Sequence, residues 1–311
     1  MNRMNRTIRW ALWRLLAATT VACAGGEETP GKDTAPPEPS PADVRRPAVT
    51  RPWTWDRRAG TLFAIPGEPG EARLVNPTYS SDQILDSLAV VSWADTSTSL
   101  ELIAGGSMLG RVQLADVRID AVCVGWPVGR ITAAPTGFAP WSVAFEPGRV
   151  EGIAFDSLPV LAPRDSAAVT TSAARAASRL PDDTSSAFRG RPFVVRQASR
   201  FATGDGGGAS LVEIVRLVPQ EANPQQEQIV MILEAATPDP AGPASAFHVR
   251  SIGLEESLAS LELLAVVRVQ ATGRVALLLR REREGGFFLQ WIERIAPGRW
   301  AVTWESALDS C

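Results

Sequence analysis

Short segments of β-forming residues, separated by turn residues, follow one another along most of the chain. The clearest segment spans residues 299–305, where Trp300, Val302 and Trp304 share one face and polar residues occupy the other. A period of two is typical of a strand with one buried face. Closely spaced segments of this kind, divided by Gly and Pro, are typical of β-sandwiches and barrels.

The C-terminal part of the chain contains four such segments in succession. They span residues 261–269, 275–280, 287–294 and 299–305. Short turns favour antiparallel neighbours, so we predict an antiparallel meander. The region 192–235 has a similar pattern. The likeness of Phe193-Val194-Val195-Arg196 to Phe247-His248-Val249-Arg250 suggests a duplicated β-unit.

One segment, near residues 165–180, has helical periodicity instead. Asp165 is placed to cap it and Pro181 to end it. We therefore expect a mostly β protein (β-rich α+β) with antiparallel meander or sandwich-like sheets and one clear helix. We expect two regions: a β-rich region at 48–162, and a region at 163–311 that begins with this helix and continues as antiparallel strands.

The N-terminal residues 1–22 have the layout of a signal peptide. Four arginines and no acidic residue precede the short apolar stretch Leu15–Ala22, which is too short to span a bilayer. The following Thr20-Val21-Ala22-Cys23 resembles the processing motif of bacterial lipoprotein precursors, although Thr20 stands where that family usually has an aliphatic residue. The resemblance covers about the first 25 residues and implies that Cys23 is lipidated.

Residues 23–47 are rich in Pro, Gly and acidic residues, as expected of a disordered tether. We therefore expect an exported protein, anchored by a lipid on Cys23 at the outer membrane or periplasmic face of the cell envelope. Ordinary signal-peptide cleavage beside Ala22-Cys23-Ala24, giving a soluble periplasmic or secreted protein, is the alternative.

The charge of the chain argues against a nucleic-acid partner. The formal net charge is −3, and removal of residues 1–22 takes away four arginines and no acid, which leaves −7. Nucleic-acid binders usually carry a basic surface.

Two cysteines, Cys123 and Cys311, are left after the anchor. In an oxidising compartment we expect a disulfide between them, with two unpaired thiols as the alternative.

Few residues are available for catalysis or metal binding. A single histidine, His248, and three cysteines cannot supply a transition-metal site, and His248 lies in a strand-like segment rather than a recognisable triad. We assign no catalytic residue, metal or cofactor. Carboxylates are plentiful, which keeps a carboxylate-based hydrolase as an alternative.

Tryptophan is unusually common, with ten residues against a single tyrosine. Most lie on strand-like segments and are expected in the core, whereas Trp53, Trp55 and Trp126 are candidates for exposed ligand-binding indoles. We expect a non-enzymatic binding or structural protein of the envelope with a protein or glycan partner. A carbohydrate- or small-ligand-binding module that uses these tryptophans is a further alternative.

Overall fold

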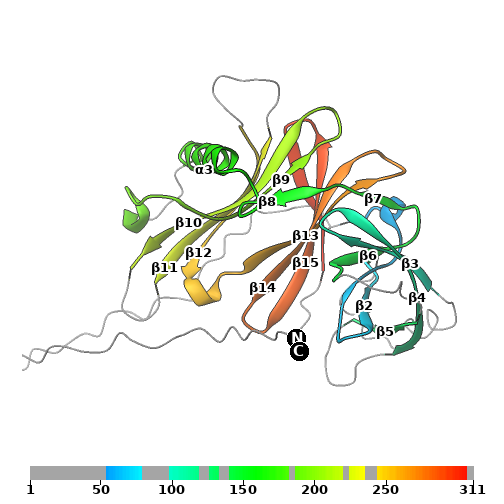
Figure 1. The fold of residues 1–311 in the computed structure, drawn as a ribbon. Coiled ribbons are helices and arrows are strands. Elements are labelled where there is room, and N and C mark those ends of the chain that lie inside the picture. Colours follow the sequence, from blue (N-terminus) through cyan, green and yellow to red (C-terminus); the bar gives the residue numbers. More distant parts are fainter. Residues whose placement is uncertain are drawn as a thin grey trace, which may run out of the picture. The chain divides into compact units, whose positions relative to one another are not determined.

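The computed structural model describes residues 54–78, 98–118, 126–132, 140–181, 186–219, 224–234 and 244–306. All of them belong to the second of two units in the chain, Ser40–Cys311. In this part of the chain the fold is mostly β, as predicted, with antiparallel sheets and one α-helix (Figure 1).

The first six strands form a closed barrel in the order β1-β2-β5-β4-β3-β6. Their bounds are β1 Phe63–Pro66, β2 Glu71–Val75, β3 Thr98–Ala104, β4 Ser107–Arg118, β5 Val128–Ile131 and β6 Val143–Phe145. The barrel closes where β1 pairs antiparallel with β6. Closure leaves no unpaired edge strand, which an open sheet would otherwise expose.

Two five-stranded antiparallel sheets follow, each made of a short edge strand and a four-stranded meander. The sheet that we call central has the order β16-β15-β14-β13-β7, and the one that we call outer has the order β12-β11-β10-β9-β8. The central strands are β7 Val150–Gly152, β13 Ser260–Val269, β14 Val275–Arg283, β15 Gly286–Ala296 and β16 Arg299–Glu305. The outer strands are β8 Phe155–Ser157, β9 Val194–Ala202, β10 Gly208–Val218, β11 Gln225–Glu234 and β12 Ala244–Leu254.

The predicted C-terminal meander is confirmed as β13 to β16. The duplicated unit drawn from Phe193–Arg196 and Phe247–Arg250 is wrong in its alignment. The first segment lies at the start of β9 and the second lies in β12 of the same outer sheet, so the two segments do not occupy equivalent positions in two units. The two sheets share one strand arrangement instead, a four-stranded meander with a short edge strand.

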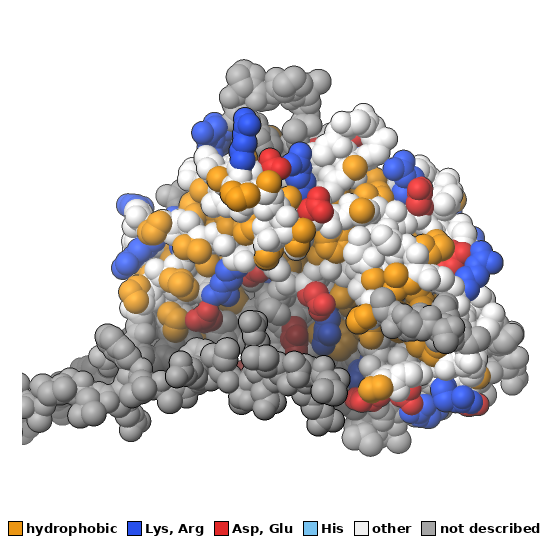
Figure 2. Space-filling model, viewed as in Figure 1, with side chains coloured by type: hydrophobic (Ala, Val, Ile, Leu, Met, Phe, Trp, Pro, Cys, Tyr) orange, Lys and Arg blue, Asp and Glu red, His pale blue; other side chains and the backbone are white. Residues whose placement is uncertain are grey.

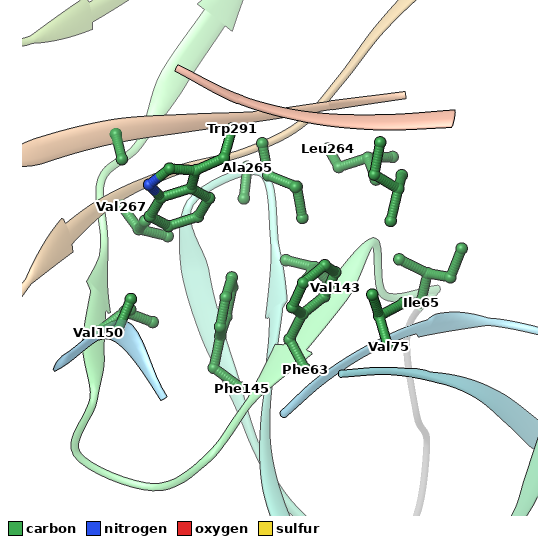
Figure 3. Packing of buried hydrophobic residues seen from close by; sticks show 14 of the residues in the cluster. Phe63, Ile65, Val75, Val143, Phe145, Val150, Leu264, Ala265, Val267 and Trp291 are labelled. Atoms are coloured by element: carbon green, nitrogen blue, oxygen red, sulfur yellow. The ribbon is translucent and has the colours of Figure 1, made fainter. Parts of the chain in front are cut away.

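The central sheet is buried on both faces. Toward the barrel, Trp291 and Val267 pack with Phe63 and Phe145 (Figure 3). Toward the outer sheet, Leu277 and neighbouring residues pack with Leu211, Val230 and Ile232. A strand that is buried on both faces has apolar residues at successive positions. The apolar run at the start of β14 follows from this burial.

The helix, α3 Pro163–Ala177, covers the other face of the outer sheet (Figure 1). Its buried alanines, Ala173, Ala176 and Ala177, pack against residues of β9, β10 and β11. The helix begins two residues before Asp165, with Pro163 in its first turn, and no side-chain cap bond is formed. The capping role predicted for Asp165 is therefore wrong, because Pro163 already sets the helical φ angle that starts the first turn.

Candidate binding site

The core between the central and outer sheets changes from apolar to polar toward one end. On β10, Leu211 is followed on the same face by Glu213, and on β14, Leu279 is followed by Arg281. These two charged residues are only 5% and 6% exposed, respectively. Buried charges at such positions require partners, because removal from water costs several kcal/mol per ion.

A hydrogen-bond network links the polar groups of the two sheets. Glu213 Oε2 accepts a bond of 2.9 Å from Gln197 Nε2, and its Oε1 accepts one of 2.6 Å from Gln228 Nε2. Arg281 Nη2 donates to Gln228 Oε1 at 3.4 Å and to the Ala259 carbonyl at 3.3 Å. Gln228 therefore connects the buried carboxylate of the outer sheet to the buried guanidinium of the central sheet.

A pocket of about 300 Å³ opens at this end of the core. We call it the polar pocket, because most of the residues that line it are polar. They are Arg196, Gln197, Glu213, Gln226, Gln228, Glu255, Leu258, Ser260 and Leu261. Arg196 and Glu255 are ion-paired at 2.5 Å and are the more exposed charged members, with 36% and 43% of their side chains accessible. Glu255 belongs to a short 3-10 helix, Glu255–Ser257, between β12 and β13.

Two buried donors beside the pocket have no hydrogen-bond partner. Gln226 is fully buried; its Oε1 accepts a bond of 2.6 Å from Arg196, but its Nε2 is unpartnered. The Nε of Arg281 is also unpartnered. A buried donor left unsatisfied costs about 1–3 kcal/mol, so the pocket wall holds a group that favours an additional acceptor.

The electrostatics of the pocket wall are balanced. Burial lowers the pKa of Arg281, whereas the carboxylates of Glu213 and Glu305 raise it. An arginine stays protonated in proteins, so Arg281 places a positive charge behind Glu213. The two acidic groups of the pocket, Glu213 and Glu255, thus each have a cationic neighbour.

A second cavity of about 210 Å³ adjoins the first. Gln197 and Leu261 line both, and Gln197 Nε2 donates a bond of 2.5 Å to the Leu261 carbonyl. Because this amide also bonds to Glu213, the Gln197 side chain is held between the two cavities.

The predicted exposure of Trp55 and Trp126 is wrong. Trp55 is 8% and Trp126 4% exposed, and both belong to the core between the barrel and the central sheet. Trp55 donates to the Gly60 carbonyl at 2.7 Å, and its ring centroid lies 4.9 Å from that of Trp291. The barrel covers these indoles, so they cannot serve as exposed ligand platforms.

The other predicted site residues, Cys23, Trp53, Cys123 and Cys311, lie outside the described residues, as do segments 1–22 and 23–47. His248 lies on β12 with a partly exposed side chain. Within the described ranges, no group of three or more His, Cys, Asp or Glu residues could hold a metal ion. No helix there is both long and apolar enough to cross a membrane.

Other buried carboxylates of the described region have structural partners. Glu234 accepts bonds from Arg294, from the Trp300 indole and from the Gly298 amide, which joins β11 to the turn before β16. Burial raises the pKa of Glu293, which lies 3.3 Å from Arg274 and outside the polar pocket.

Sequence reasoning missed the polar pocket, although a signal was present. In β11, Val230 and Ile232 face the central sheet, and the same period places Gln226 and Gln228 on that buried face. The side-chain amides of Gln226 and Gln228 therefore interrupt the apolar face of β11. The meeting of Gln228 with Arg281, more than fifty residues away, depends on the stacking of two sheets and has no local signal.

Comparison with protein-family models, with curated proteins and with solved structures finds no match. On the face shown in Figure 2, acidic and basic side chains lie beside one another rather than in separate patches of one sign.

Proposed function

We propose that this chain is a non-enzymatic binding protein of the cell envelope, held at the membrane by a lipid on Cys23, with the polar pocket as its binding site. One observation carries the proposal: the pocket wall contains Gln226, a fully buried amide whose donor has no partner. Convergent polar groups in a concave site fix the orientation of a small ligand, and a ligand acceptor would satisfy the Gln226 donor.

The N-terminal sequence supports the location. A basic and apolar segment, the motif ending at Cys23 and a Pro- and Gly-rich stretch together favour export, anchoring and a tether. A binding domain on such a tether would reach ligands or envelope partners near the membrane surface.

The carboxylates of the pocket favour binding over hydrolysis. Glu213 accepts two amide donors and Glu255 accepts from Arg196, so both are already engaged as acceptors. A general acid must instead hold a proton and present it to a leaving group.

The anchor is tested by expressing the full chain in bacteria fed with radiolabelled palmitate. We expect label and membrane fractionation in the wild type and in Cys123→Ala, and neither in Cys23→Ala. A labelled, membrane-bound Cys23→Ala variant would exclude the proposed anchor.

The absence of catalysis is tested with the purified full chain and ester, peptide and glycan substrates. We expect no turnover that depends on the pocket. Turnover that is lost in Glu213→Gln but kept in the exposed control Glu256→Gln would replace the binding function with a hydrolase.

A further inference from the structure

We infer that the polar pocket takes a neutral, polyhydroxylated ligand about the size of a single sugar ring. The inference rests on the proposed binding function and adds the chemical class of the ligand. The size, the charge balance and the hydrogen-bonding groups of the pocket each favour this class.

The size limits the ligand to one ring. A volume of about 300 Å³ lies at the lower end of the range of small-molecule pockets, roughly 300–1,000 Å³. The adjoining cavity does not extend this space, because Gln197 bonds to both Glu213 and the Leu261 carbonyl between the two.

The charge balance favours a neutral ligand. Arg196 pairs with Glu255 at the more exposed side, and at the buried side Gln228 bonds to both Glu213 and Arg281. A ligand with a net charge would meet no unbalanced opposite charge, and it would have to lose its hydration to enter.

The hydrogen-bonding groups favour hydroxyls. The unpartnered Gln226 Nε2 requires an acceptor, whereas the carboxylates of Glu213 and Glu255, which already accept bonds, have further lone pairs that can accept from a ligand donor. A hydroxyl group both donates and accepts, so adjacent hydroxyls on one ring satisfy both demands. Leu258 and Leu261 supply an apolar wall for the C–H groups of such a ring.

The test uses the full chain in detergent and saturation-transfer NMR. The neutral probes are glucose, galactose, mannose and N-acetylglucosamine, and the charged probes are glutamate, phosphate and choline. We expect transfer to at least one neutral probe and to no charged probe. The affinity for the neutral probe should fall at least tenfold in Gln226→Leu and in Glu255→Ala.

The control is Glu256→Ala, which removes an exposed carboxylate next to Glu255 in the same short helix and outside the pocket wall. It should bind like the wild type. Because Gln226 is buried and its variant can misfold, Glu255→Ala, at an exposed position, decides the result if Gln226→Leu is unfolded.

Three results would overturn the inference: no transfer to any neutral probe, neutral binding unchanged in both variants, or binding of a charged probe. If a charged probe binds and the two variants abolish its binding, the ligand class is wrong but the pocket is a binding site. The anchor and turnover experiments decide the proposed function separately.

Discussion

At the scale of single residues, buried polar groups of the central and outer sheets hold one another in place. Glu213 and Arg281 come from different sheets, and Gln228 connects them through hydrogen bonds. Gln197 joins Glu213 to the Leu261 carbonyl of the central sheet. Buried pairs of this kind are weak contributors to stability, but removing one partner is destabilising because the other charge stays buried. Their presence at the end of an otherwise apolar core is therefore better explained by the pocket than by folding.

The first prediction concerns Arg281. Arg281→Met leaves Glu213 buried without its cation and should lower the free energy of unfolding by about 3–5 kcal/mol. Urea denaturation measures this loss. Arg283→Met, at an exposed position on the same strand, is the control and should change stability little. Equal stability of both variants would show that Glu213 does not depend on Arg281.

The second prediction concerns His248, the single histidine of the chain. Partial burial and the nearby Arg250 lower its pKa from 6.5. The unfolded chain then binds this proton more tightly, so the contribution of His248 to stability is present above pH 6.5 and declines as the pH falls through the folded pKa. The single imidazole signal in an NMR titration should have its midpoint below 6.5; a midpoint above that value contradicts the packing around β12.

At the scale of elements, the helix and the meander follow from local pattern, but their partners do not. The alternation of apolar and polar residues in β16 and the short turns around β15 predict antiparallel pairing. The apolar residues at helical spacing in α3 predict an amphipathic helix. The burial of Trp55 depends on a barrel that contacts the central sheet, which no spacing in its own segment indicates. The short strand β7 pairs with β13 more than a hundred residues later.

The third prediction tests the packing of α3 on the outer sheet. Ala173 is fully buried against that sheet, so Ala173→Leu should overpack the contact and cost about 1–3 kcal/mol. Ala167→Leu makes the same change at an exposed position of the same helix and should have little effect. Thermal unfolding of the two variants side by side provides the comparison. If Ala167→Leu is the more destabilising, the helix faces the other way.

At the scale of the whole molecule, the described chain is a set of layers in which the central sheet is buried on both faces. The barrel covers one face and the outer sheet the other, and α3 covers the outer sheet in turn. Sequence predicts the class of this fold because strand periodicity is local. It could not predict the closed barrel or the polar pocket, since β1–β6 closure and the meeting of Gln228 with Arg281 join residues far apart in sequence.

The central claim is that the polar pocket binds a small ligand, and native mass spectrometry of the full chain extracted from its own membranes tests it most directly. The wild type and Glu256→Ala should both carry a small molecule at a one-to-one ratio, and Glu255→Ala should lose most of it. A wild-type chain that carries no such molecule, or an adduct retained equally in Glu255→Ala, would contradict the claim.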